Sequence, residues 1–185
     1  MELKRLPKTT YLCWRYPFLK LYLDKDKFFC TWCYYYAIPS GWRKAFGLQM
    51  LEEIRRSLIR TGGKKALKSM SIQDVKEKFG SLQIYCSATP EVYKIIQKYE
   101  YISSHTCINC GKPATVITTG WICPYCNDCV GDKYCVHFGH KYGMFWYGWT
   151  GNIDYIPKEQ WEKEEKFLNE FYENNNSTGC KEASS

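Results

Sequence analysis

The sequence has few of the features that would assign a function directly. Histidine accounts for only three of the 185 residues, and no P-loop, G-x-S-x-G or H-E-x-x-H motif is present. The motifs of zinc deaminases are missing too, because His105 has no acidic residue two positions on and Pro124 is misplaced relative to Cys126. These absences argue against the common catalytic classes, and we expect a protein that is not an enzyme.

Targeting and membrane segments are missing as well. The chain contains no run of about eighteen apolar residues, which a transmembrane helix would require. Residues 1–7 show neither the apolar core nor the cleavage site of a secretory signal. Eleven cysteines, an odd number, favour metal ligands and free thiols in a reducing compartment over a secreted disulfide framework. We therefore expect a cytoplasmic protein that does not engage a membrane.

Aromatic residues and positive charge are what the chain has in excess. Sixteen tyrosines, nine phenylalanines and seven tryptophans make up 17% of the sequence, enough to fill a core and an interface. The net charge is +7, with the basic excess before residue 80 and an acidic excess in 151–185. Solvated helix faces explain such an imbalance, and so does a surface that binds phosphate or an acidic partner.

Four cysteines carry the strongest functional signal. Cys107-Ile-Asn-Cys110 and Cys126-Asn-Asp-Cys129 are two C-x-x-C pairs with fifteen residues between them. This spacing is typical of one structural zinc site, because each tight turn presents two thiolates to a tetrahedral metal. We expect Zn2+ as the cofactor, with β-structure at 115–119 inside the linker and a turn at Gly120.

An overlapping pair leaves one alternative for the ligand set. Cys123-Pro-Tyr-Cys126 is also a C-x-x-C pair, so Cys123 could replace Cys126 or Cys129. Its Pro124 lacks an N–H that could donate to a sulfur, whereas both amides between Cys126 and Cys129 are available. We therefore favour Cys107, Cys110, Cys126 and Cys129.

A third pair, Cys30-Thr-Trp-Cys33, raises the question of a second metal site. On a regular strand the two thiols would point to opposite faces, which argues against shared ligation. If the chain bends there, Cys135, His137 and His140 could complete the site; packed thiols are the simpler expectation. His137 and His140 are also the only support for a third function, a metal-dependent nuclease.

Hydrophobic periodicity predicts the elements of an α+β fold. The first half should contain a β-hairpin from 19–23 and 28–38, a helix over 40–60 capped by Ser40 and ended by Thr61-Gly62-Gly63, and a short helix or turn at 71–80. The second half should contain a strand over 81–87, a helix from Thr89-Pro90 to about Ile102, and a last helix from Pro157.

These elements suggest a fold class and four segments. We expect a small, mostly antiparallel sheet, about three helices and a zinc-ribbon or treble-clef-like module. The segments are an α+β core (1–102), a zinc knuckle (103–130), an aromatic segment with a helix packing back on the core (131–173), and a disordered tail (174–185).

Three segments resemble, in this order, a family of small and mostly uncharacterised phage and prophage proteins. They are Val75-Lys-Glu-Lys-Phe-Gly-Ser-Leu-Gln-Ile-Tyr85, Ser103-Ser-His-Thr-Cys-Ile-Asn-Cys-Gly-Lys-Pro113, and Gly120-Trp121 ahead of Cys126-Asn-Asp-Cys129. The resemblance covers about 72–129 and, at its widest, Gly41-Trp42. It implies metal ligation by Cys107, Cys110, Cys126 and Cys129, a phage origin and hence a bacterial host cytoplasm, but no activity.

Two positions depart from that family pattern. Ser81 stands where the family has a second glycine, and Gln83 where it has a basic residue. If the basic residue binds phosphate in the family, this chain has lost that contact.

Two further regions are candidate binding surfaces. A basic region over 43–78 could contact nucleic acid or an acidic partner through Arg55, Arg56, Arg60, Lys64, Lys65 and Lys68. An aromatic, glycine-rich region could join the core or form a protein interface through Phe138, Tyr142, Phe145, Trp146, Tyr147 and Trp149.

The leading hypothesis is therefore a non-catalytic, zinc-stabilised protein that binds a host protein, for host takeover or against host defence. The first alternative is a zinc protein that binds DNA or RNA through the basic region, and the second is the nuclease.

Overall fold

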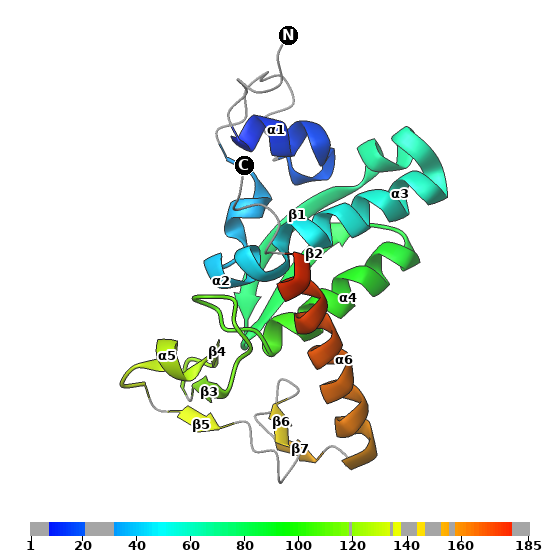
Figure 1. The fold of residues 1–185 in the computed structure, drawn as a ribbon. Coiled ribbons are helices and arrows are strands. Elements are labelled where there is room, and N and C mark those ends of the chain that lie inside the picture. The colour runs from blue at the N-terminus through cyan, green and yellow to red at the C-terminus, as the bar shows by residue number, and fades with distance from the viewer. Residues whose placement is uncertain are drawn as a thin grey trace.

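The computed structural model describes residues 8–20, 32–118, 120–133, 135–137, 144–146, 153–155 and 158–178. These residues form helices and small antiparallel sheets, which confirms the predicted α+β class (Figure 1). None of the described helices combines the length and the apolarity that a membrane span requires.

The elements follow one another along the chain in this order: α1 (Lys8–Arg15), the 3-10 helices η2 (Pro17–Leu19) and η4 (Tyr34–Ala37), α2 (Ser40–Trp42), the π-helical η5 (Arg43–Gly47), α3 (Leu48–Ser69), β1 (Ser71–Lys78), β2 (Ser81–Ser87), α4 (Pro90–Ser104), β3 (Val116–Thr118), β4 (Pro124–Tyr125), α5 (Asn127–Val130), β5 (Cys135–His137), β6 (Met144–Trp146), β7 (Ile153–Tyr155) and α6 (Lys158–Thr178). Strands pair as β1-β2, β4-β3-β5 and β6-β7, all antiparallel.

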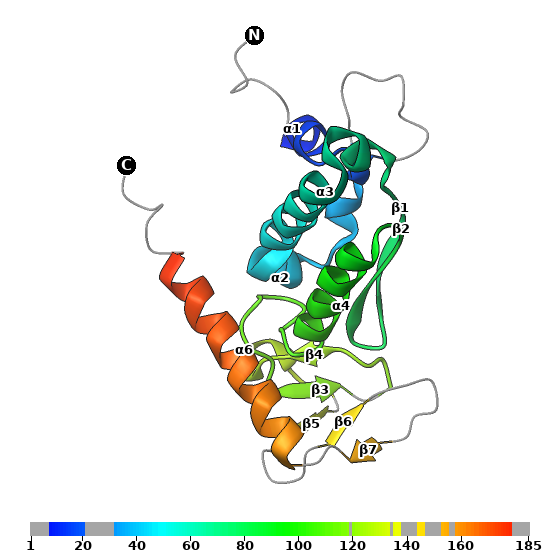
Figure 2. The ribbon, with the colours of Figure 1, turned by 90° about the vertical axis from the view of Figure 1, so that its right-hand side faces the viewer.

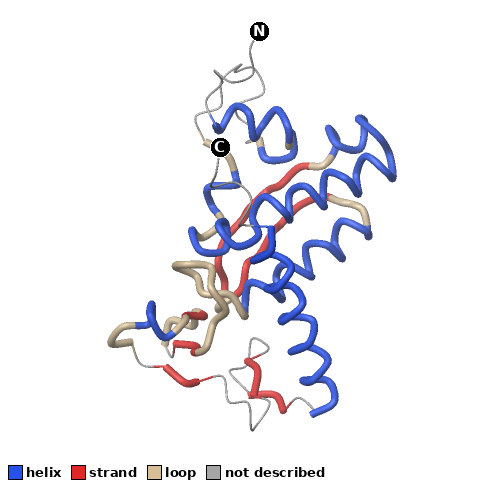
Figure 3. The backbone as a smooth tube through the Cα atoms, viewed as in Figure 1, coloured by secondary structure: helices blue, strands red, loops and turns tan. Residues whose placement is uncertain are grey.

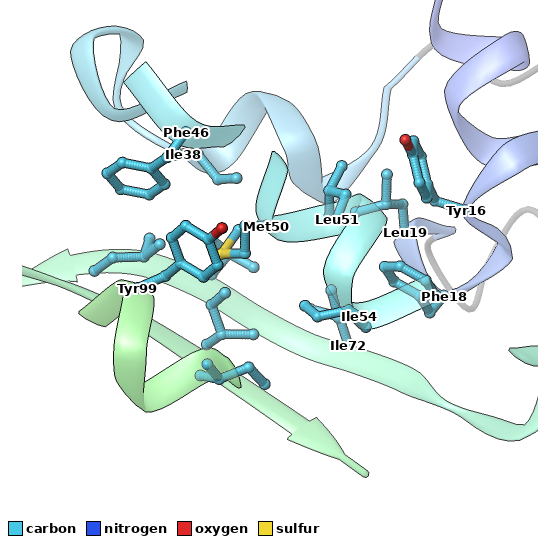
Figure 4. Packing of buried hydrophobic residues seen from close by; sticks show 14 of the residues in the cluster. Tyr16, Phe18, Leu19, Ile38, Phe46, Met50, Leu51, Ile54, Ile72 and Tyr99 are labelled. Atoms are coloured by element: carbon cyan, nitrogen blue, oxygen red, sulfur yellow. The ribbon is translucent and has the colours of Figure 1, made fainter. Parts of the chain in front are cut away.

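The main core lies between the β1–β2 hairpin and the helices α3 and α4, which run side by side along it (Figures 1 and 2). Apolar side chains of all these elements meet there, and Figure 4 shows Phe46, Met50 and Ile54 facing Tyr99 and Ile72. Burying such side chains stabilises the fold by roughly 1.5–3 kcal/mol each. Six of the buried core residues are aromatic: Tyr16, Phe18, Trp42, Phe46, Tyr99 and Phe171.

The prediction of a short helix or turn at 71–80 is wrong, because these residues form strand β1 and the turn that follows it. Ile72 and Val75 are both buried although they are three positions apart, a spacing typical of a helix. A β-bulge between Ile72 and Asp74 adds a residue to the strand and brings both side chains to one face. Because of the bulge, the side chains of β1 do not show the regular two-residue alternation of a strand.

The predicted hairpin over 19–38 is wrong wherever the chain is described. Residues 34–37 form the 3-10 helix η4, and 21–31 lie outside the described residues. The hydroxyl of Tyr34 donates to Gln73 O on β1 at 2.7 Å, and the ring of Tyr35 packs against Gly47. Packing of these large rings overrides the β propensity of the segment.

The long helix after residue 40 is confirmed, with three differences in detail. It begins as α2 and the π-helical η5 before α3. The non-helical φ/ψ angles of Gly62 and Gly63 interrupt it as predicted, but helical turns resume up to Ser69. Ser40 does not cap it, and its hydroxyl donates instead to Asn109 O at 3.5 Å.

The strand at 81–87 and the helix after it are confirmed as β2 and α4. Thr89 caps α4 by accepting a hydrogen bond from Val92 N, and Pro90 occupies the first turn. The last helix, α6, runs to Thr178 and so includes 174–178, which the sequence analysis placed in the tail. Polar composition alone does not end a helix that is already propagating.

Candidate metal centre

Beyond the end of α4 the chain forms loops around the short elements β3, β4 and α5 (Figures 1 and 3). These loops bring four cysteines together. Cys107 and Cys110 lie in the turn that follows α4, while Cys126 immediately precedes α5 and Cys129 lies within it. Between the two pairs, the antiparallel strands β3 and β4 turn the chain back towards the first loop. Loop, hairpin and short helix follow in the order of a treble-clef-like module.

The four sulfur atoms have the spacing of a metal site. All of them lie within 4.8 Å of one another, and Cys110 Sγ is 3.6 Å from Cys126 Sγ. Because Zn–S bonds are about 2.3 Å long, a tetrahedral zinc separates its sulfurs by about 3.8 Å. Cys107 and Cys126 are buried, and Cys110 and Cys129 are half-buried. The cluster therefore fits one metal ion such as zinc.

Burial and hydrogen bonds shift the pKa values of three of the thiols in different directions. Burial opposes ionisation of Cys107, but backbone hydrogen bonds from Cys110, Cys126 and Asn109 prevail and lower the pKa of Cys107 to about 7. Burial raises the pKa of Cys126, and hydrogen bonds with Cys126 and Cys110 raise the pKa of Cys129 to about 12. A divalent cation that binds here must displace the remaining thiol protons.

Cys123, the alternative ligand, lies outside the cluster of four sulfurs. It is buried in the turn between β3 and β4, where its N–H donates to Thr118 Oγ1 at 2.9 Å. Burial, reinforced by the Glu77 carboxylate, raises the pKa of Cys123 to about 11. Its thiol is thus a protonated packing group of the hairpin.

Two glycines let the first cysteine loop touch the helical core backbone to backbone. A Cβ at Gly41 would lie 2.4 Å from Cys107 O and 2.5 Å from Ile108 O, and one at Gly111 would lie 2.6 Å from Gly41 O. Gly111 also has a φ of +82°, which favours glycine. The N–H of Gly41 donates to Ile108 O at 2.9 Å. The loop is therefore held against the start of α2.

Two buried hydroxyl groups at the end of α4 support the same junction. The Ser103 Oγ accepts a hydrogen bond from Leu82 N on β2 at 2.7 Å, which ties the end of α4 to the hairpin. The Thr106 Oγ1 donates to Ile102 O at 2.7 Å, and both side chains are fully buried. The S-x-x-T-C part of the sequence motif is thus a structural joint between core and cysteine loop.

Residues distant in sequence complete this joint. The indole N–H of Trp42 donates to Thr106 O at 2.8 Å, and the hydroxyl of Tyr172 on α6 donates to His105 O at 3.0 Å. Neither role is predicted by the sequence. The resemblance at Gly41-Trp42 was the only indication in the sequence for the role of Trp42. No local signal indicated the role of Tyr172.

The tip of the β1–β2 hairpin also lies against the cysteine module. A Cβ at Gly80 would be 3.3 Å from Ile122 Cγ2, so the two turns are in close proximity. Phe79 and Trp121, one on each turn, are 62% and 78% exposed. Phe79 has a φ of +51°, an unfavourable conformation for a bulky residue. Sequence reasoning did not identify either ring as an exposed surface feature.

The proposed second metal site falls largely outside the described side chains. Cys30 and His140 are not described, and for Cys135 and His137 only the backbone of β5 is. Cys33 is fully buried beside Cys13; the hydrogen bond from that thiol lowers the pKa of Cys33 against the effect of burial. Among the described side chains, only Cys107, Cys110, Cys126 and Cys129 form a group that could hold a metal.

The six candidate basic residues divide into two groups along α3. Arg55 and Arg56 both form ion pairs with Glu52. The four residues that follow are exposed and form no ion pair with any residue the structure describes: Arg60, Lys64, Lys65 and Lys68. The region is thus partly neutralised by ion pairs at one end, and at the other end Arg60 interacts electrostatically with Glu91 of α4 without forming an ion pair.

The six aromatic interface candidates cannot be placed as side chains. Phe145 and Trp146 belong to β6, whose backbone alone is described, and Phe138, Tyr142, Tyr147 and Trp149 lie outside the described residues.

Comparisons with protein-family models, with curated proteins and with solved structures found no match for this chain. The resemblance to phage proteins therefore depends on the motifs alone.

Proposed function

We propose that this chain is a zinc-stabilised binding protein without catalytic activity of its own. The four-sulfur cluster is the observation that carries the proposal. Four thiolates complete the tetrahedral coordination of zinc, whereas a catalytic zinc keeps one position open for water or substrate. The ion would therefore hold the two loops together rather than activate a reactant.

The joint between the cysteine module and the core supports this structural role. The first loop is fixed by Gly41, Trp42 and Tyr172, and the β1–β2 turn lies against Ile122. A metal that orders the second loop would also order the turn that carries Trp121. Zinc would thus make an exposed surface rigid, which lowers the entropic cost of binding a partner.

Phe79 and Trp121 define the surface that we assign to the partner, which we call the two-turn surface. Large exposed aromatic rings are typical hot spots of protein interfaces. The positive φ of Phe79 strengthens this assignment, because strain at an exposed position is retained where it serves a function. The partner would be a protein, and the resemblance to phage proteins implies a protein of the bacterial host.

Metal analysis tests the first part of the proposal. We expect one zinc per chain in protein purified without chelators, and loss of that zinc in Cys129→Ser. Cys123→Ser is the matched control, because its thiol lies outside the cluster and should not affect metal content. Metal-free protein, or equal zinc loss in the control, would contradict a four-cysteine site.

Partner capture tests the second part. The wild-type protein and Trp121→Ala are immobilised and exposed to bacterial lysate at low and high salt. We expect a bound protein that resists salt, as for an aromatic interface, and is lost with Trp121→Ala. Phe167→Ala is the control, since Phe167 is 38% exposed but lies on α6. Identical capture by all three proteins would argue against the two-turn surface.

A further inference from the structure

Three arginines converge on one carboxylate where α1 meets α3. Glu52 accepts hydrogen bonds from Arg15 at 2.9 Å, from Arg55 at 2.9 and 3.0 Å, and from Arg56 at 3.1 Å. The hydroxyl of Tyr16 adds a longer contact of 3.3 Å. Arg15 comes from a different helix, so folding creates this arrangement and the sequence alone does not indicate it.

The cluster keeps an excess of positive charge that faces solvent. Three guanidinium groups and one carboxylate leave a net charge of +2. Arg56 uses only its Nε to reach Glu52, and its side chain is 76% exposed. The carboxylate already holds the arginine side chains in place. An anion that binds here would therefore immobilise few additional rotatable bonds of these side chains. A planar guanidinium is also well matched to phosphate oxygens.

The positive charge continues along α3. Arg60 lies one turn beyond Arg56, on the same helix face, and is exposed. Past the interruption at Gly62 and Gly63, three more exposed lysines follow: Lys64, Lys65 and Lys68. Glu53, the only other acidic residue of α3, is directed to Lys98 and Tyr99 on α4. Arg15, Arg56 and Arg60 therefore form a short track of positive charge, and Glu91 of α4 interacts electrostatically with it at Arg60.

Two exposed aromatic rings lie next to this track. Tyr11 lies on the same face of α1 as Arg15, four residues before it, and Trp14 follows Tyr11 by three residues. The two rings are 40% and 63% exposed. Their ring centroids are 6.5 Å apart. Figures 1 and 2 both show α1 beside α3. Flat exposed rings beside arginines are the combination with which proteins bind single-stranded nucleic acid, because bases stack while phosphates pair with the cations.

We propose that the α1–α3 surface binds single-stranded nucleic acid. Bases stack on Trp14 and Tyr11, and the phosphodiester backbone follows Arg15, Arg56 and Arg60. A duplex would leave the rings without a role, because its bases are already stacked on one another. This site is separate from the two-turn surface, so it does not depend on the protein partner proposed above, and either proposal can fail alone.

Binding of labelled oligonucleotides to the zinc-loaded protein tests the proposal. The probes are a 20-nucleotide oligo-dT, a 20-nucleotide oligo-U and a 20-base-pair duplex, each measured by fluorescence anisotropy at several salt concentrations. We expect one or both single strands to bind more tightly than the duplex, with affinity that falls as salt rises. The two single strands distinguish DNA from RNA as the ligand.

Two variants separate the contributions of charge and stacking. Arg56→Gln combined with Arg60→Gln should weaken binding roughly tenfold and reduce the salt slope by about 1.4, that is about 0.7 for each lost phosphate contact. Trp14→Ala should weaken binding roughly tenfold without changing the salt slope. A merely structural effect of these exposed positions would instead appear as a lower melting temperature.

The controls match each variant elsewhere on the molecule. Lys163→Gln removes an exposed cation from α6, and Phe167→Ala removes an exposed ring from the same helix. Both should bind within twofold of wild type. The proposal is overturned if no single strand binds at low salt, if the controls lose as much affinity as the variants, or if the duplex binds equally well and Trp14→Ala has no effect. Binding to vesicles containing phosphatidylserine, without binding to oligonucleotides, would also overturn it and indicate a membrane surface.

Discussion

Glu52 illustrates how a single residue can organise a surface. Its side chain is 19% exposed, and its carboxylate is surrounded by the guanidinium groups of Arg15, Arg55 and Arg56. The hydrogen bonds from Arg55, followed by those from Arg56 and the charge of Arg15, outweigh burial and lower the pKa of Glu52 to about 2. The ionised form is thus strongly favoured in the folded protein.

The pKa of Glu52 predicts a pH-dependent contribution to stability. Because the folded pKa lies below the ordinary value of 4.5, the ionised carboxylate stabilises the fold above about pH 4.5. This contribution is lost as the pH falls from 4.5 towards 2. At pH 7, Glu52→Gln should lower the free energy of unfolding by on the order of 2 kcal/mol.

Urea denaturation of the wild-type protein and of Glu52→Gln at pH 7, 4 and 2.5 measures the difference between their free energies of unfolding. We expect it to shrink steadily as the carboxylate is protonated. Glu170→Gln removes a carboxylate of an exposed pair on α6 with a 4.0 Å separation from Lys166. It should change the free energy of unfolding by less than about 0.5 kcal/mol. A Glu52→Gln deficit that is unchanged at pH 2.5 would show that the carboxylate charge is not the cause.

At the scale of elements, the β1–β2 hairpin combines a bulge at one end with a strained turn at the other. Phe79 and Gly80 both have positive φ, which is the conformation of a tight two-residue hairpin turn and favours Asn-Gly. The N–H of Gly80 donates to Glu77 Oε1 at 2.8 Å, which supports the turn. Phenylalanine at the first position is therefore poorly suited to the local backbone.

The strained turn predicts a stabilising substitution. Phe79→Asn should raise the free energy of unfolding by about 0.5–1 kcal/mol, because asparagine tolerates positive φ better than a bulky residue does. Phe79→Ala is the control, since it removes the ring but keeps the backbone conflict, and it should give no such gain. Thermal and urea unfolding of the three proteins would check this. Equal stability of the two variants would mean that the backbone at 79 is not strained.

The elements also show where sequence patterns are sufficient. The cap formed by Thr89 and Pro90 and the alternation of β2 are local signals, and both elements were predicted correctly. The bulge near Asp74 and the ring contacts of Tyr34 involve other segments, and the predictions at 71–80 and over the described residues 32–38 were wrong. Local propensity was overridden where a side chain packs against a segment distant in the sequence, or where an extra residue changes the pairing of a strand.

The whole molecule depends on the junction between the helical core and the cysteine module. The two parts meet backbone to backbone at Gly41, which lies against the carbonyl groups of Cys107 and Ile108. These are backbone atoms, which cannot move aside as a flexible side chain can. The junction therefore connects metal binding to the stability of the core.

Gly41→Ala should disrupt this junction. A methyl group placed 2.4 Å from Cys107 O forces the loop away from α2, and we expect a loss of about 3 kcal/mol in the free energy of unfolding. Faster release of zinc to a coloured chelator should accompany this loss. Gly120→Ala is the control, because it meets no atom within 4 Å and costs only its φ of +82°, about 1–2 kcal/mol. Equal losses in both variants would show that the junction tolerates a side chain.

The sequence by itself determined the local features of this protein: the two C-x-x-C pairs, the capped helix that leads to them, the strand at 81–87 and the helix break at Gly62-Gly63. Each depends on spacing or backbone preference within a few residues. Only the tertiary structure decided that Trp42 and Tyr172 hold the cysteine module, that Arg15 joins the arginines of α3, and that the turn at Gly80 lies against Ile122. These arrangements arise from packing between segments far apart in the chain, and no local pattern records them.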